Sequence, residues 1–248
     1  MTRIYPSKIY QFILGPLLGL LLTMPLFIVQ ENYHIFQDDI FTHIFFVSLI
    51  GTSLLFFYFF NKYKRNTLRI TCTLKKSDIP LLMWSALYVL LIEVCFFSIN
   101  AYSKAGELSD QPLDMYLIIA SICIAPLMEE LLFRQYFLSG LLSANKPVKA
   151  ICINALLFGL FHIQLSQIIL GLVLGLLFAC VFCKTKNIAN SIILHALANS
   201  LSFLLVYLSS QFAWLSSDFS MIHLLIMLFA CLLLLLVTAG KLYALTLK

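Results

Sequence analysis

The chain has 248 residues, of which 62% are hydrophobic and only 11% are charged, and its mean hydropathy is +0.99. Soluble domains have roughly 45–50% apolar residues, so this composition excludes an ordinary soluble fold and favours lipid as the solvent. The formal net charge of +5 is small, and no basic face is interleaved with exposed aromatic residues, which argues against nucleic acid as a partner. We therefore expect membrane lipids to surround the chain.

Apolar runs of about 20 residues, the length that crosses a bilayer as a helix, follow one another along the chain. They predict an all-α, polytopic transmembrane bundle that forms a single transmembrane domain over residues 1–248. The run at 148–163 is short and the next follows closely, so a tight hairpin and a re-entrant segment are both open there. The predicted spans, about eight in number, are 9–30, 40–61, 80–100, 114–143, 148–163, 166–183, 188–209 and 219–240.

Basic residues fall mostly into alternate loops between these spans. Lys and Arg are enriched in the cytoplasmic loops of membrane proteins. With eight crossings and an inside N-terminus, 14 of the 16 Lys and Arg lie inside, so we expect both termini to be cytoplasmic. These are Arg3, Lys8, Lys62, Lys64, Arg65, Arg69, Lys75, Lys76, Lys146, Lys149, Lys184, Lys186, Lys241 and Lys248.

Two glycine pairs with GxxxG spacing lie within predicted spans. They are Gly15 with Gly19, and Gly171 with Gly175. Small residues at this spacing let membrane helices approach closely, so both pairs predict tight packing within the bundle.

Three ionisable residues lie within the apolar run at 114–143, where each costs about 2.5–3.5 kcal/mol on insertion scales. Glu130 and Arg134 stand four residues apart, so they share one face of a helix and can pair. Glu129 points about 100° away from its neighbour and is left without that partner. An unpaired buried carboxylate suits general acid–base chemistry. The alternative is an intramembrane ion pair that only ties helices together.

Two later spans add further polar side chains. His162 lies one turn after Phe158, and His195 shares a helical face with Asn199, four residues on. Taken singly, such residues more often make hydrogen bonds between helices. If the three spans meet, a Glu–His pair can activate water, and a second His with Asn can stabilise a developing oxyanion. This combination predicts a hydrolase that uses water directly, without a Ser or Cys nucleophile.

The same residues resemble the motifs of a known family. In chain order they match the three motifs of the CPBP family, which contains the CAAX prenyl proteases and the bacteriocin-processing and self-immunity (Abi) membrane proteins. All three motifs lie within residues 114–209, which we take as the catalytic core. The motifs are Glu129-Glu130-x-x-x-Arg134, Phe158-x-x-x-His162 and His195-x-x-x-Asn199.

The resemblance implies an intramembrane, glutamate-dependent endopeptidase of eight helices, with a cavity that opens to the cytosolic side. Glu129 and His162 would activate the water. His195 and Asn199 would form the oxyanion-stabilising pair. The residues expected to support the site structurally are Glu130, Arg134 and Phe158.

A metal ion is a separate question. Glu129, His162 and His195 could supply the three protein ligands of an open zinc site, and members of the family are often described as metalloproteases. The spacing is not HExxH, however, and the reaction can also be drawn with water held by Glu and His alone. A divalent metal such as zinc and no cofactor at all are both open alternatives.

The expected substrate is a hydrophobic or lipid-modified peptide, or a protein precursor, at the membrane. The small size and the usage rich in Lys, Asn and Ile favour a bacterial cytoplasmic membrane, and hence peptide maturation, quorum sensing or bacteriocin immunity. One alternative is a non-catalytic partner of a sensor kinase, or an immunity protein. A proton-coupled transporter is less favoured, since no inverted repeat of broken helices is visible.

Overall fold

The computed structural model describes residues 5–33, 35, 38–64, 71–103, 115–162, 164–211 and 229. Every regular element within these residues is a helix, which confirms the predicted all-α class. The predicted span at 219–240 lies outside the described residues, apart from Phe229. Within the described part of the chain, six helices are long and apolar enough to cross a membrane, as expected of a multi-pass membrane protein: Tyr10–Tyr33, Ile40–Tyr63, Lys76–Ile99, Met115–Leu142, Leu165–Thr185 and Ile188–Ser209.

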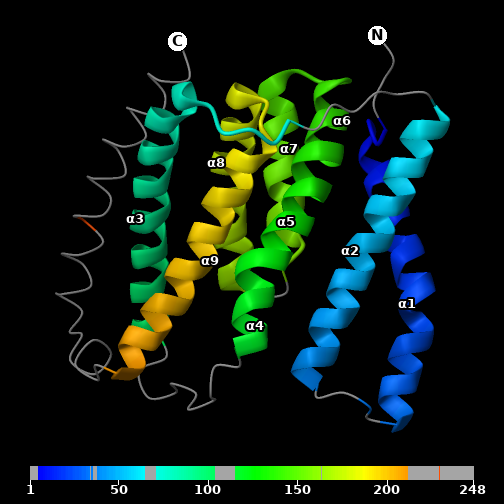
Figure 1. Cartoon of the computed structure of the whole chain (residues 1–248), viewed down its shortest axis with the longest axis horizontal. Coiled ribbons are helices and arrows are strands. Elements are labelled where there is room, and N and C mark those ends of the chain that lie inside the picture. Colours follow the sequence, from blue (N-terminus) through cyan, green and yellow to red (C-terminus); the bar gives the residue numbers. More distant parts are fainter. Residues whose placement is uncertain are drawn as a thin grey trace.

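The helices form a bundle in which α1 and α2 lie at one side and α3 lies at the other, with the remaining helices between them (Figure 1). In chain order the elements are η1 (Ile9–Phe12), α1 (Leu14–Tyr33), α2 (Asp38–Tyr63), η2 (Lys76–Asp78), α3 (Ile79–Ser103), α4 (Met115–Ile119), η3 (Ala120–Ile124), α5 (Ala125–Glu130), η4 (Leu131–Leu138), α6 (Ser139–Leu142), α7 (Pro147–Leu160), α8 (Leu165–Thr185) and α9 (Ile188–Gln211).

The stretch from Met115 to Leu142 is continuous helix that changes its winding along its length. Both η3 and η4 are π-helical, and the six-residue α5 lies between them. π-helical turns are rare and occur frequently at functional sites. Glu129 and Glu130 are the last two residues of α5, directly before the second π-helical segment.

α7 is shorter than the membrane is thick. Its 14 residues make a helix about 21 Å long at 1.5 Å per residue, against about 30 Å of hydrocarbon. α8 starts a few residues later and packs along α7 in the opposite direction (Figure 1). The short run at 148–163 therefore forms one arm of a tight hairpin, which is one of the two arrangements that its sequence leaves open.

Glycines let two helix pairs pack at close range. A Cβ added to Gly19 of α1 would lie 2.6 Å from Thr52 Oγ1 and 2.8 Å from the carbonyl oxygen of Leu49, both on α2. A Cβ added to Gly171 of α8 would lie 3.3 Å from the Cα of Gly159 on α7. Lipid offers apolar contacts as good as those between helices, so such close packing contributes much of their association. The tight approach predicted from the GxxxG pairs is confirmed.

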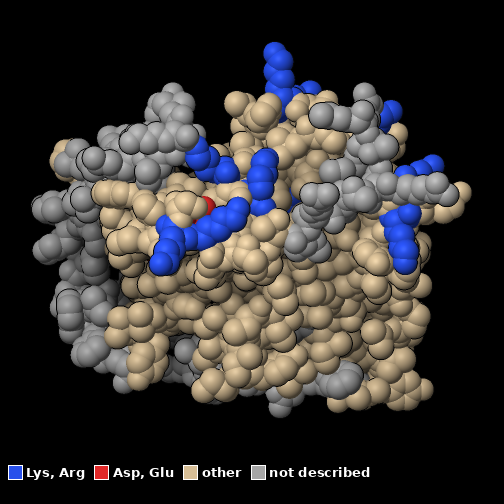
Figure 2. All heavy atoms as spheres, turned by 45° about the horizontal axis from the view of Figure 1, so that its top comes forward, with Lys and Arg blue, Asp and Glu red and all other residues tan. Residues whose placement is uncertain are grey.

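The described lysines gather at one end of the bundle, which we call the basic end. They lie near the start of α1, at the end of α2, before α3, and at the turns that join α6 to α7 and α8 to α9, all near the top of Figure 1. Figure 2 shows the same gathering on the upper part of the surface. The lysines are Lys8, Lys62, Lys64, Lys75, Lys76, Lys146, Lys149, Lys184 and Lys186.

We expect the basic end to face the cytoplasm, because Lys and Arg are retained on that side. The test is labelling of intact cells with a membrane-impermeant maleimide, after the seven native cysteines are replaced by serine. A cysteine at position 32, at the far end of α1, should react in intact cells. A cysteine at position 145, at the basic end, should react only after permeabilisation. The reverse pattern would show that the orientation is inverted.

Replacing Gly19 with Ala should lower the free energy of unfolding by about 1–3 kcal/mol, because the new methyl group would meet a backbone carbonyl that cannot move aside. Gly51→Ala is the matched control, since its Cβ would meet only Met128 Cε, at an ordinary 3.6 Å. Thermal unfolding in detergent measures both. Equal losses would mean that α1 and α2 do not pack as closely as described.

Candidate active site

A fully buried arginine lies at the centre of the bundle. Arg134 donates from Nε to Glu130 Oε2 at 2.8 Å and from Nη2 to Glu130 Oε1 at 3.2 Å, so the pairing predicted from their spacing is confirmed. Nη1 donates to the amide oxygen of Asn154 on α7, and the Asn154 amide donates to the carbonyl of Phe133 at 2.8 Å. A buried ion pair is stable only when further hydrogen bonds satisfy it, and Asn154 supplies one.

Two phenylalanine rings enclose the same guanidinium. Arg134 Cζ lies 4.7 Å from the ring centroid of Phe158 and 5.9 Å from that of Phe178. A cation over an aromatic face is attracted by the negative face of the ring, more strongly where water is excluded. Phe158 was expected beside the site from its motif. Phe178 was not, because one Phe in the apolar run of α8 carries no signal.

His195 on α9 lies between the two neighbouring glutamates. Its Nδ1 is 3.0 Å from Glu130 Oε1, and its Nε2 is 3.9 Å from Glu129 Oε2. An ionised carboxylate only accepts hydrogen bonds, so Nδ1 carries a hydrogen. The sequence grouped Glu130 with Arg134 alone, whereas the structure shows that Glu130 also orients His195. The ring is held in place by stacking on Phe178, with centroids 5.4 Å apart.

Glu129 is buried, and one of its oxygens has no hydrogen bond. The residue is 5% exposed, and Oε2 has no hydrogen-bond partner among the described residues. The same oxygen lies 3.9 Å from Nε2 of His195. A buried polar atom without a partner is uncommon in a native structure and calls for an explanation. A buried acceptor beside His195 has the position and chemistry to accept a proton from water.

His162 follows the last turn of α7. Its Nδ1 lies 3.1 Å from the carbonyl oxygen of Phe158, which can only accept, so Nδ1 carries the hydrogen. In the neutral ring Nε2 then keeps a lone pair, as a base requires. Gly171 of α8 leaves room for this ring, because a Cβ there would lie 3.2 Å from Nδ1 and Cε1.

One face of α9 carries a stripe of polar residues that joins three other segments. Asn199 Nδ2 donates to the carbonyl of Ser121 in η3 at 2.7 Å, which leaves its second N–H hydrogen available. Ser202 Oγ donates to Glu93 Oε2 on α3 at 2.6 Å. With His195 bonded to α5, the stripe positions α9 against three segments. Ser202 was not singled out in the sequence, because serine is common in membrane helices.

The three residues considered as zinc ligands were Glu129, His162 and His195. Within the described part of the chain, no three His, Cys, Asp or Glu side chains come together as ligands of one ion. The Nδ1 of His195 is also bonded to Glu130. The positions of these three residues do not form a zinc site. The mechanism proposed for this protein therefore uses no metal ion, and a requirement for metal is tested with a chelator.

Comparison with known proteins adds an independent observation. Residues 111–201 match the family model described as "Type II CAAX prenyl endopeptidase Rce1-like". The predicted resemblance to the CPBP family is confirmed. The matched segment contains all three motifs, from Glu129 to Asn199.

Two curated relatives resemble part of the chain. "Putative membrane peptidase YdiL" of Bacillus subtilis (strain 168) is 30% identical over 84 residues, which are 34% of this chain and 34% of that protein. "UPF0177 protein YxdF" of Lactococcus lactis subsp. lactis (strain IL1403) is 39% identical over 77 residues, 31% of this chain and 42% of that protein. The matches thus span less than half the length of either relative. No solved structure matches.

Replacing Arg134 with Ala should lower the free energy of unfolding by about 3–5 kcal/mol, because Glu130 would be left as a buried charge without its cation. Glu129→Gln is the control on the adjacent residue. This substitution removes one charge that is not part of the Arg134–Glu130 pair, and we expect a much smaller loss of unfolding free energy. Denaturation in detergent, followed by circular dichroism, measures both. Similar losses would mean that the pair does not hold the centre of the bundle.

Proposed function

We propose that the protein is an intramembrane endopeptidase that cleaves a hydrophobic or lipid-modified peptide, or a protein precursor, by direct attack of water. The family match over residues 111–201 supports a CAAX-type membrane peptidase. The observation that carries the mechanism is the free, buried Oε2 of Glu129 beside His195, next to a Glu130 whose oxygens are both engaged.

In this mechanism Glu129 accepts a proton from water while the water oxygen attacks the carbonyl carbon of the substrate. His162 helps to activate the water by accepting a hydrogen bond from it at Nε2. This nitrogen keeps its lone pair because the hydrogen of the ring is on Nδ1, bonded to the Phe158 carbonyl. When the carbon–nitrogen bond breaks, the protonated Glu129 gives its proton to the leaving amine. Water is thereby divided between the new carboxyl group and the new amine, and Glu129 returns to its starting state.

The tetrahedral intermediate carries a negative charge on oxygen. Asn199 can offer its second N–H hydrogen, since the first is bonded to Ser121. His195 can offer Nε2–H if its ring is protonated. His195 lies beside both glutamates while Arg134 pairs with Glu130 alone, so a protonated His195 would balance the second carboxylate. Such charged donors are strong in a water-excluded site.

Both curated relatives come from bacteria, and the first bears the name "Putative membrane peptidase YdiL". This supports a bacterial cell membrane as the location. Peptide maturation, generation of a quorum-sensing signal and bacteriocin immunity are all roles in which a small membrane peptidase would act on a hydrophobic peptide.

The test is cleavage by the purified full chain of a panel of hydrophobic, acylated and prenylated peptides carrying a fluorophore and a quencher. Wild-type protein should cleave at least one of them, and Glu129→Gln should lower kcat by about 10²–10⁴-fold, because it removes the general base. His162→Ala should also lower kcat, through loss of the second base.

Glu31→Gln is the matched control, since Glu31 is exposed near the end of α1 and should not affect cleavage. A parallel series with a chelator, followed by added zinc, tests the metal. Cleavage that survives in Glu129→Gln would refute the mechanism. If the wild type cleaves nothing, and a cellular phenotype persists in the Glu129→Gln strain, the protein acts instead as a non-catalytic membrane partner.

A further inference from the structure

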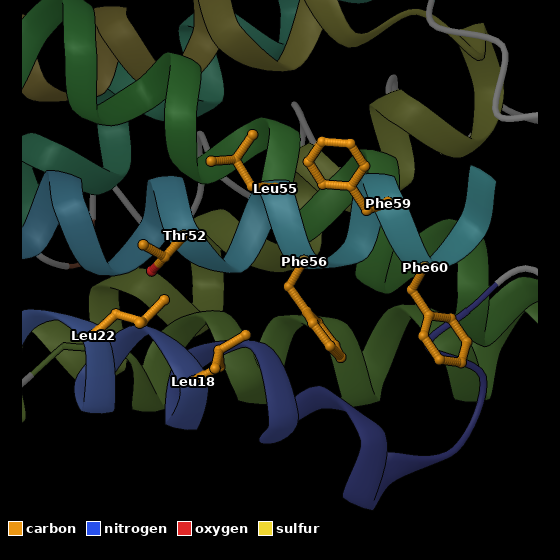
Figure 3. A pocket seen from close by; sticks show the side chains of 7 residues that line it. All are labelled: Leu18, Leu22, Thr52, Leu55, Phe56, Phe59 and Phe60. Carbon is orange, nitrogen blue, oxygen red and sulfur yellow. The ribbon is translucent and has the colours of Figure 1, made fainter. Parts of the chain in front are cut away.

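An apolar groove runs along the outer side of the bundle between α1 and α2, apart from the candidate active site. It has a volume of about 440 Å³. In Figure 3, Phe56 and Phe60 point from α2 toward α1, where Leu18 and Leu22 line the facing side. Thr52 lies at the end of the groove opposite Phe60. Its hydroxyl donates to the carbonyl of Ser48 in its own helix at 2.9 Å, so an apolar ligand in the groove would not leave this hydroxyl without a hydrogen bond.

The groove is open to the surroundings of the bundle. Leu22, Leu55 and Phe59 line it and are each 58–60% exposed. In a membrane these side chains meet hydrocarbon, and an acyl chain fits an open apolar channel of this kind. Phe60 lies eight residues after Thr52 on α2, so the groove follows about 12 Å of the helix axis.

The upper end of the groove meets the positive charge of the basic end. Lys64 Nζ lies 5.8 Å from the ring centroid of Phe60, which itself lines the groove. Lys62 lies one turn from Tyr58, with its Nζ 5.9 Å from that ring. Both lysines are exposed, and neither forms an ion pair with a carboxylate among the described residues. They offer unneutralised charge to an anion.

The depth of these groups matches one class of molecule. Phe60 and Lys64 are four residues apart, or about 6 Å along the axis, so the cations lie just beyond the apolar channel. In a bilayer the acyl chains start directly beneath the headgroups in the same way. We propose that the groove is a binding site for an anionic glycerophospholipid, with one acyl chain along α1 and α2 and its phosphate at Lys64, while Lys62 adds positive charge from a neighbouring face of α2.

This site is independent of the proposed peptidase activity. A bound lipid would fill the space between α1 and α2 and hold the pair together. It would stabilise the folded protein by an amount that rises with the logarithm of its affinity, as any ligand of the native state does. Selectivity for an anionic headgroup separates such a site from the ordinary lipid that covers any apolar helix.

The experiment is native mass spectrometry of the detergent-purified full chain, titrated with phosphatidylglycerol or with phosphatidylcholine of the same acyl chains. We expect one phosphatidylglycerol to bind at least about tenfold more tightly than phosphatidylcholine, since each lysine near the headgroups contributes to anion binding. Lys62→Gln combined with Lys64→Gln should abolish this preference. Lys146→Gln combined with Lys149→Gln removes equal charge elsewhere at the basic end and should preserve it.

A second pair of variants tests the channel. Leu22→Trp should fill the groove and weaken binding of both lipids, whereas Leu21→Trp, on an adjacent residue that is 66% exposed and does not line the groove, should not. Circular dichroism checks that each variant is folded. Equal binding of the two lipids by wild-type protein would overturn the proposal, as would equal effects of the two lysine pairs. Should Leu22→Trp misfold, the lysine pairs decide the matter alone.

Discussion

The pairing of Arg134 with Glu130 inside the bundle is the interaction on which the arrangement of the site depends. It holds Asn154, and through it α7, and it leaves Glu130 Oε1 able to accept from His195 on α9 as well. In a low dielectric these charge-assisted contacts are strong when all are made and costly when one is missing. Three segments distant in sequence are thereby held in one geometry.

Two neighbouring glutamates have different environments here. Glu130 accepts from Arg134 and His195 with both of its oxygens, while Glu129 Oε2 has no hydrogen-bond partner among the described residues. Identical side chains acquire separate roles in this way, because the environment sets how each carboxylate behaves. The π-helical segments on either side of α5 change the winding of the helix around this pair.

Much of the fold was predictable because lipid imposes a simple rule: long apolar runs form helices. The pairing of Glu130 with Arg134 was also predictable, since it is local to one helix. The bond from Arg134 to Asn154 was not, because it joins residues that only the tertiary packing brings together. The same is true of the contact between His195 and Glu130, which gives Glu130 a second task.

The reversal of the chain after α7 has a consequence for hydration. Lipid offers no hydrogen bonds, so backbone groups outside a regular helix at that depth must find protein or water. The amides of Phe161 and His162 still bond back to carbonyls of α7, but the last carbonyls of a helix lack amide partners within it. A hairpin that turns within the bilayer is stable only in a wet or protein-lined interior. The turn at His162 therefore has to be lined by protein or reached by water, and water is the second reactant of the proposed hydrolysis.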